Sequence, residues 1–136
     1  MMTVGEIGRR SGIAVHVIRY YTRIGLLKPS RNQRNRYKQY RESDLSRLRF
    51  IRQAKTLGYT LGEITRIFRD AGMGTSPCPM VRQIIQRRIG ENGRRLNELK
   101  ALQKRMEYAL AEWSRLPDGV PDGHTVCYLI ESVAGV

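Results

Sequence analysis

Residues 3–25, TVGEIGRRSGIAVHVIRYYTRIG, decide the fold of the first half of the chain. Their pattern predicts a short helix from about Val4 to Arg10, ended by Gly12, and a second helix from Val15 to Ile24, ended by Gly25. Glycine commonly ends a helix because it adopts the left-handed conformation at little cost. Two short helices with a tight glycine-containing connection are typical of a helix-turn-helix motif.

These two predicted helices carry a capping signal and a binding face. The Thr3 hydroxyl can accept a hydrogen bond from the Glu6 amide while the Glu6 carboxylate accepts from the Thr3 amide, which is a capping box. One face of the second predicted helix carries polar side chains at spacings of three and four residues: His16, Arg19, Tyr20 and Arg23. Arginine binds phosphate or guanine and a tyrosine hydroxyl binds phosphate, so this face suits the major groove of DNA.

Two residues of this helix have plainer interpretations. Tyr20 and Tyr21 are neighbours on a helix and point about 100° apart, so we expect one to be buried and the other exposed. An exposed His16 without a role is as reasonable as a DNA contact.

The next segment is rich in basic and amide side chains. Short strands around a turn near Asn32–Asn35 would form a hairpin, or wing. Its cations suit the phosphate backbone beside a DNA groove. A disordered basic loop is the alternative. The basic and aromatic residues of this segment are Lys28, Arg31, Arg34, Arg36, Tyr37, Lys38, Tyr40 and Arg41.

Two further helices should complete this domain. An apolar stripe begins after Ser43 and runs to Leu57, where Gly58 ends it. Thr60 and Glu63 repeat the capping-box spacing and open a helix that continues to Ala71. We therefore predict a winged helix-turn-helix DNA-binding domain over residues 1–72 and a linker rich in Gly, Ser and Pro over residues 73–78.

Residues 79–114 predict one long helix with a heptad seam. Its seam residues alternate in steps of four and three: Ile85, Ile89, Asn92, Leu96, Leu99, Gln103, Met106, Leu110 and Trp113. A helix this long cannot bury its seam against so short a chain, so it favours a partner helix and a homodimer. One helix of an intramolecular bundle is the alternative, although the sequence offers no second long helix. Residues 115–136 form a short C-terminal tail. The predicted fold class is mainly α.

Charge separates the two halves. The chain carries 25 Lys and Arg against 12 Asp and Glu, and residues 1–72 hold 16 of the first group against 5 of the second. Phosphate polyanions are the partners that such a cationic half favours, although membrane surfaces and acidic proteins are also polyanionic. We find no apolar signal segment, no run long enough to span a bilayer, and no disulfide framework in two distant cysteines. These features favour a reduced cytoplasmic protein without a membrane partner.

An enzyme is disfavoured by the scarcity of reactive side chains. The chain has two His, two Cys and no glycine loop that would cradle a phosphate. A nucleophile, a base and an orienting group cannot be assembled from this set in one chain.

The order and spacing of several segments resemble the MerR family of bacterial transcriptional activators. The resemblance covers about 115 residues and includes the place of the long helix. The matching segments are TVGEI at 3–7, Gly12-Ile13, IRYY at 18–21, GLL at 25–27, Pro29, Arg36-Tyr37, Tyr40, Asp44-Leu45, Leu48, Ile51 and LGYTLGEI at 57–64.

The resemblance implies a mechanism and a set of contacts. Members of the family are homodimers, joined by antiparallel helices, that bind a palindromic site between promoter elements spaced too widely for RNA polymerase. An effector makes the dimer bend and untwist the DNA. By resemblance Thr3, Arg19, Tyr20, Arg36 and Tyr37 contact DNA, mostly at phosphates. Lys38 stands where the family often has arginine, which weakens a bidentate contact there.

The two cysteines resemble those of the metal-sensing branch of the family. Cys78 precedes Pro79 at the start of the long helix, where the free amides and the helix dipole favour a thiolate. Cys127 lies in the tail, three residues after His124, and an antiparallel dimer would bring this tail toward the partner's Cys78. The branch usually has another cysteine where this chain has Trp113-Ser114. Two thiolates suit Cu(I) or Hg(II); Cd(II), Pb(II) and Zn(II) are also thiophilic, but a tetrahedral zinc site would need more ligands.

Other interpretations of the cysteines and of the whole chain stay open. An exposed, low-pKa thiol also suits a redox or electrophile sensor. Free cysteines are often small buried apolar residues, and Cys127 within VCYLI fits that description. An architectural DNA-binding protein without an effector, or an adaptor between proteins, would need neither thiol.

Overall fold

The computed structural model describes residues 1–133, which form a mainly helical chain with one small sheet. The elements are α1 (Val4–Ser11), α2 (Val15–Arg23), β1 (Ser30–Arg31), β2 (Lys38–Gln39), α3 (Glu42–Thr56), α4 (Leu61–Gly72), α5 (Cys78–Trp113) and α6 (Tyr128–Glu131). Contacts divide the chain into two compact units, Met1–Ile85 and a second that begins at Gln86. Within residues 1–133, no helix combines the length and apolar character that a membrane span requires.

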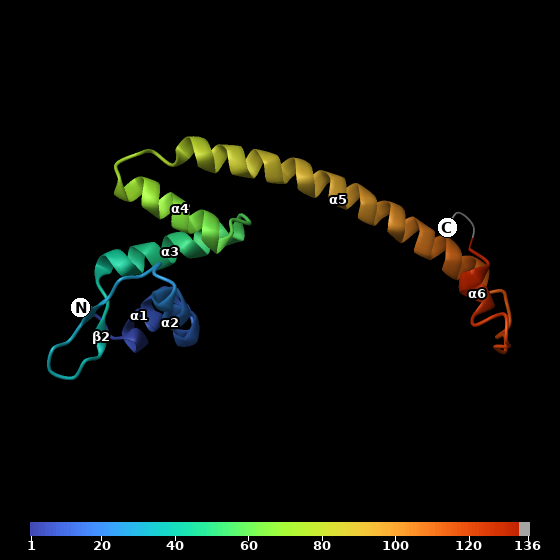
Figure 1. Ribbon diagram of the computed structural model, residues 1–136, viewed down its shortest axis with the longest axis horizontal. Helices are drawn as coiled ribbons and strands as arrows, with labels where there is room; N and C mark the ends of the chain where they lie inside the picture. Colours follow the sequence, from blue (N-terminus) through green and yellow to red (C-terminus); the bar gives the residue numbers. More distant parts are fainter. Residues whose placement is uncertain (134–136) are drawn as a thin grey trace. The chain divides into compact units, whose positions relative to one another are not determined.

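The helix-turn-helix prediction is confirmed with small shifts of its helix ends. The Thr3 hydroxyl accepts from the Glu6 amide at 3.2 Å, which is one half of the expected capping box. Gly12 is left-handed (φ 72°), and its amide donates to the Gly8 carbonyl at 2.9 Å. In Figure 1, α1 and α2 lie beside each other next to α3, and α1 packs against both.

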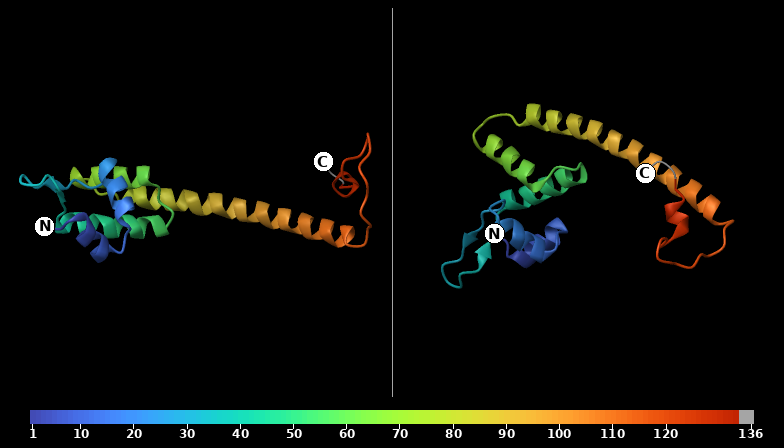
Figure 2. Two further views of the ribbon diagram at one scale, coloured as in Figure 1. Left: turned by 90° about the horizontal axis from the view of Figure 1, so that it is seen from below. Right: turned by 45° about the vertical axis from the view of Figure 1, so that its right-hand side comes forward.

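One apolar core holds the first unit together. Figure 2 shows from two further sides that α1 to α4 gather in this unit. The side chains Ile7, Ile18, Leu45, Leu48 and Ile51 are fully buried there. Burying one such side chain contributes about 1.5–3 kcal/mol, so this core fixes the rotation of α2 about its axis. Tyr21 is buried and Tyr20 is 41% exposed, as their spacing predicts.

The wing, residues 30–40, is an ordered hairpin. β1 and β2 pair antiparallel, with Ser30 opposite Gln39. The turn between them is held by the Asn32 side chain, which accepts from the Arg34 amide at 2.8 Å, and by a left-handed Arg36 (φ 60°). Met2 adds a backbone bridge to Tyr40, with two hydrogen bonds of 2.7 Å. The prediction of a hairpin is therefore confirmed, and the disordered loop is not what this segment forms.

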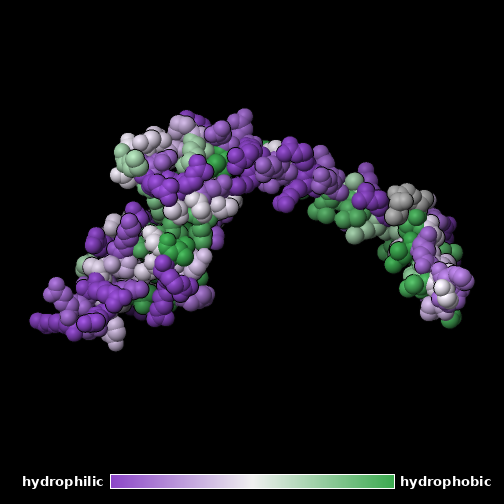
Figure 3. All heavy atoms as spheres, in the orientation of Figure 1, coloured by the Kyte–Doolittle hydropathy of each residue, from purple (hydrophilic) through white to green (hydrophobic). Residues whose placement is uncertain are grey.

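Helix α5 belongs to both units. It begins at Cys78, one residue earlier than predicted, and ends at Trp113. Its first two turns pack on the first unit, where Ile84 is buried and Met80, Val81 and Ile85 are partly buried. The seam residues from Ile89 to Leu110 are exposed in the single chain, with Leu99 60% exposed and Leu110 64% exposed, and Trp113 is half-buried. Figure 3 shows apolar residues gathered on the C-terminal half of α5 and hydrophilic residues on the half before it.

The tail folds against the end of α5. It contains α6, a short helix that was not predicted from the sequence. The Tyr128 hydroxyl donates to the Pro117 carbonyl, and the Asp122 carboxylate accepts from the His124 and Thr125 amides at 2.7 and 2.8 Å. These bonds give the segment before α6 a defined turn.

Candidate nucleic-acid interface and effector region

A shallow hollow on the first unit gathers most of the predicted DNA-binding residues. We call it the cationic hollow, because four cations and no carboxylate line it. It lies between the start of α1, the exposed face of α2 and the wing, and its lining residues are Thr3, Val4, Gly5, Arg19, Arg23, Arg36, Tyr37, Lys38 and Tyr40. Such a concentration of guanidinium, ammonium and hydroxyl groups suits phosphate oxygens.

Helix α2 presents two of these cations one turn apart. Arg19 and Arg23 are exposed on the face opposite the buried Ile18 and Tyr21. The Arg23 guanidinium lies over the Tyr20 ring, 5.4 Å from its centre. This cation–π contact holds the Arg23 side chain against the helix. The side chain would therefore lose little conformational entropy on contacting DNA.

The wing supplies the other cations and is tied to α2. The hydroxyls of Tyr40 and Thr22 lie 2.8 Å apart, and the Thr22 hydroxyl also donates to the Ile18 carbonyl at 2.8 Å. Tyr40 itself is buried, whereas Tyr37 is 71% exposed. The anchored Tyr40 therefore fixes the distance between α2 and the turn of the wing.

Helix α3 braces the C-terminal ends of both helices of the helix-turn-helix. Arg52 donates to the Ser11 carbonyl at 2.9 Å and to the Gly12 carbonyl at 3.0 Å. Arg47 donates to the Leu26 carbonyl at 3.0 Å, just beyond α2, and stacks on Phe68. Carbonyls at a helix end carry partial negative charge, so a cation is favourable there. These two arginines hold α1 and α2 in place relative to α3.

Most, but not all, of the predicted DNA-binding residues line the cationic hollow. Thr3, Arg19, Arg23, Arg36, Tyr37 and Lys38 meet in the cationic hollow. His16 is exposed on the first turn of α2 but does not line the hollow, and Tyr20 lies beside it under Arg23. Sequence reasoning missed Val4, Gly5 and Tyr40. The Thr3 cap was the available signal for the first two, because the first turn of a helix offers free amides to a phosphate.

The thiols occupy the ends of two helices. Cys78 is exposed at the start of α5, and its amide donates to the Ser76 hydroxyl at 3.3 Å. Cys127 is half-buried just before α6, and His124 is exposed. Across residues 1–133, no three side chains of His, Cys, Asp or Glu come together in a way that would hold a metal ion.

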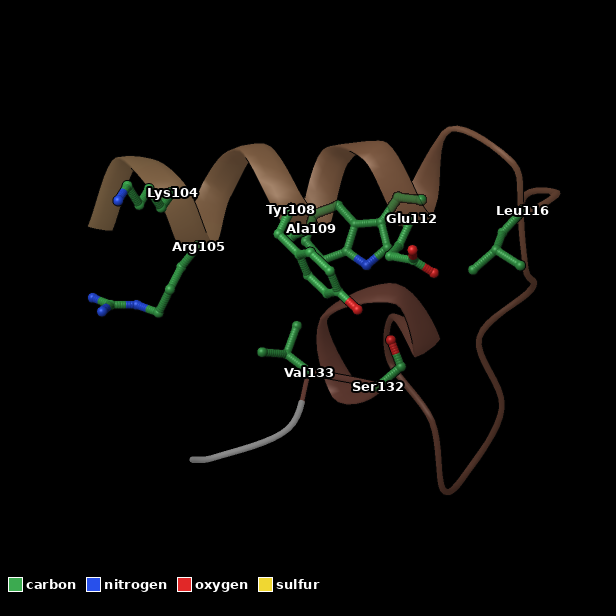
Figure 4. Close-up of a pocket in the computed structure, with 9 residues that line it drawn as sticks. Lys104, Arg105, Tyr108, Ala109, Glu112, Leu116, Ser132 and Val133 are labelled. Atoms are coloured by element: carbon green, nitrogen blue, oxygen red, sulfur yellow. The ribbon is translucent and has the colours of Figure 1, made fainter. Parts of the chain in front are cut away.

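A second hollow lies between the last turns of α5 and the residues after α6. Lys104 and Arg105 stand at one end, and Tyr108 extends toward Ser132 and Val133 (Figure 4). Trp113 and Leu116 also line it. Trp113 is half-buried there and lines this hollow in the single chain, and its place in a dimer seam stays a prediction.

Comparison with known families identifies the kind of protein. The family described as "MerR HTH family regulatory protein" matches residues 2–71, and "MerR, DNA binding" matches residues 45–109. The regulator HmrR of Rhizobium leguminosarum bv. viciae is 33% identical over 110 residues, which cover 79% of this chain and 82% of that protein.

Two solved structures are similar over nearly the whole chain. One is the transcription regulator PbrR691 from Ralstonia metallidurans CH34 in complex with lead(II), with TM-score 0.76, 25% identity and coverage of 98% of this chain and 100% of that one. The other is MerR from Bacillus megaterium MB1 in complex with mercury(II), with TM-score 0.58, 29% identity and coverage of 96% and 98%. The chain, with its winged helix-turn-helix, its cationic hollow and its long α5, belongs to the MerR family of DNA-binding transcriptional regulators.

Proposed function

We propose that this chain acts as a homodimer that binds promoter DNA and changes the shape of that DNA when a thiophilic metal ion binds. The observation that carries the proposal is the position of Cys78. Its thiol is exposed on the first turn of α5, and the same two opening turns are packed into the unit that holds the cationic hollow.

The DNA contact is made mainly at phosphates. Arg19 and Arg23 on α2, with Arg36, Tyr37 and Lys38 on the wing, offer donors from two directions. Phosphate contacts fix the position of a protein on the duplex, while side chains in the major groove read bases. His16 and Tyr20 remain candidates for base or backbone contacts on the same helix.

The exposed seam of α5 is proposed as the dimer interface. An antiparallel pair centred on Leu99 sets Ile85 opposite Trp113 of the partner subunit and Asn92 opposite Met106 of the partner subunit. Ile89 falls within one residue of Leu110 of the partner subunit, and Leu96 within one residue of Gln103 of the partner subunit, so this pairing brings all seam residues level to within one residue. The same alignment sets Cys78 level with the partner's tail, near residue 120. Asn92 and Gln103 would fix the register at some cost in stability.

The proposed metal ligands are Cys78 of one protomer and Cys127 of the partner subunit, with His124 of the partner subunit as a candidate third ligand. Two thiolates fit Cu(I) or Hg(II), which accept two-coordinate binding. Support comes from the similar proteins whose structures hold lead(II) and mercury(II). The ion would tie the start of α5 to the tail of the other chain.

The effect on transcription follows from DNA deformation. A duplex resists bending and untwisting, so a dimer that distorts its site must supply free energy that depends on its own conformation. Metal binding would favour the distorting conformation and align promoter elements for RNA polymerase.

The test is a metal titration of reduced protein under anaerobic conditions. Cu(I), Hg(II), Zn(II), Cd(II) and Pb(II) are added in turn, while thiolate-to-metal absorption and free thiols are measured. Tight binding of one ion per cysteine pair, lost in Cys78→Ser and in Cys127→Ser, supports the proposal and names the ion.

The main rival is a redox or electrophile sensor, favoured by the exposure of Cys78 at a helix start. Rapid oxidation or alkylation of Cys78 without tight metal binding would replace the metal proposal by this one. If neither is observed, the chain is a DNA-binding dimer whose effector lies elsewhere or is absent.

A further inference from the structure

Tyr59 is held rigidly between two helices. α3 ends with a left-handed Gly58 (φ 89°), and the Tyr59 amide donates back to the Ala54 carbonyl at 3.1 Å. The next residue, Thr60, caps α4: its hydroxyl accepts from the Glu63 amide at 3.1 Å, and its amide donates to the Glu63 carboxylate at 2.9 Å. Because both neighbouring segments are capped, the backbone of Tyr59 is fixed between α3 and α4.

The Tyr59 hydroxyl reaches a third helix beside the proposed sensor thiol. The ring is 6% exposed, and its hydroxyl donates to the Val81 carbonyl at 2.7 Å. Val81 lies three residues after Cys78, on the same face of the first turn of α5. The Val81 amide donates to the Pro77 carbonyl at 2.9 Å, so this turn is ordered on either side of the thiol. A displacement of the turn would break this partly buried hydrogen bond or carry Tyr59 with it.

Helix α3 continues the connection to the DNA-binding helices. Arg52 holds the carbonyls at the end of α1, and Arg47 holds the Leu26 carbonyl beyond α2. All these donors lie in the first unit, so α3 and the turn that follows it connect the first turn of α5 with the C-terminal ends of α1 and α2.

We propose that Tyr59 is a positioning residue that couples the first turn of α5 to the orientation of α2 on DNA. The inference rests on the proposed function in one respect, because Cys78 is taken as the place where an effector acts. Coupling between two sites is reciprocal. If an effector at Cys78 changes how α2 meets DNA, then DNA bound at α2 changes the environment of Cys78, and Tyr59 carries both effects.

The test measures this reciprocal effect without any metal. Full-length Cys127→Ser protein leaves Cys78 as its one thiol, and N-ethylmaleimide reports the alkylation rate of that thiol. The rate is compared for free protein, for protein saturated with a duplex selected by the protein from a random library, and for protein with a duplex of unrelated sequence. We expect the selected duplex to change the rate at least about 5-fold, in line with ordinary allosteric coupling.

The decisive variant is Tyr59→Phe in the same background, which removes one hydroxyl and keeps the ring. We expect it to bind the selected duplex nearly as well and to reduce the DNA-dependent rate change to less than about 2-fold. Tyr108→Phe removes an exposed hydroxyl from the second unit and should keep the full change. Thermal unfolding of each variant confirms that it is folded.

Two outcomes overturn the inference. An equal rate change in Tyr59→Phe would show that the hydroxyl carries no coupling and that DNA acts on Cys78 by another route, such as shielding. No rate change in the parent protein would show that the first turn of α5 and α2 are independent. A metal titration that fails overturns the proposed function but leaves this readout intact, so the two failures are distinguishable.

Discussion

The hydroxyls of Thr22 and Tyr40 lie 2.8 Å apart and join the reading helix to the strand that ends the wing. The Tyr40 side chain is almost fully buried and its hydrogen bond to Thr22 is partly buried, so this bond contributes to the stability of the fold. Tyr40→Phe should lower the free energy of unfolding by about 1 kcal/mol, measured by urea denaturation. Tyr37→Phe is the matched control, because its exposed hydroxyl should matter for DNA affinity and not for stability. Equal stability of wild type and Tyr40→Phe would contradict this role.

Arg19 is exposed in the middle of α2 and lines the cationic hollow. Arg19→Ala should weaken binding to a selected duplex by about 1–3 kcal/mol if the contact is to a base, or reduce the salt slope by about one if it is to a phosphate. Fluorescence anisotropy at several salt concentrations measures both. Lys100→Ala, on the exposed surface of α5, serves as the control and should bind normally. An Arg19→Ala protein with wild-type affinity at moderate salt would remove this residue from the interface.

Leu99 lies at the centre of the proposed dimer seam. Leu99→Asp would bring a carboxylate into an apolar interface and next to its own copy, so we expect monomers in sedimentation-velocity experiments. Lys100→Asp introduces the same side chain one residue away, outside the seam, and should leave a dimer. If Leu99→Asp sediments as a dimer at micromolar concentration, the seam is not the interface.

Cys78 is proposed to sense the effector without holding the fold together. Its thiol is exposed, so Cys78→Ser should retain DNA binding and lose induction by the metal, measured with a reporter promoter. Ser76→Ala removes the hydroxyl that accepts from the Cys78 amide and keeps both thiols, so it should remain inducible. Normal induction of Cys78→Ser would end the metal proposal.

Arg10 and Glu42 form an ion pair between α1 and α3, with Nη1 and Oε1 2.5 Å apart. The hydrogen bond and charge of Arg10 lower the pKa of Glu42 below its ordinary value. A lowered folded-state pKa gives stability that is present above the unfolded pKa and is lost as the pH falls through the folded pKa. The difference in unfolding free energy between wild type and Glu42→Gln should therefore be present near pH 7 and disappear in acid. Because the pair is exposed, the difference should be small. A difference that grows on acidification would contradict the assignment.

Local signals in the sequence predicted the helices and the wing well. Gly12, Gly25 and Gly58 each take positive φ where a helix was expected to end. Thr3 and Thr60 cap helices through hydroxyls, as their spacing predicts. These features depend on residues within one turn, so sequence spacing describes them directly.

Contacts between residues far apart in the chain could not be predicted from the sequence. Arg52 meets Ser11 across 41 positions, and Tyr59 meets Val81 across 22. Nothing in helical periodicity marks an arginine on α3 as a brace for α1 rather than a solvated charge. For the same reason the sequence assigned His16 to the interface by helix face alone, while the cationic hollow is completed by Val4, Gly5 and Tyr40.

The burial of Ile84 determines where this regulator can be joined to another protein to make a hybrid. A hybrid protein joined at the linker after Gly72 would discard Ile84, Met80 and Val81, and it would leave the hydroxyl of Tyr59 without its acceptor. A graft that keeps the chain through Ile85 carries the whole first unit. A foreign sensor domain should therefore be fused within α5, with the helix continued in phase, because the first unit ends inside that helix.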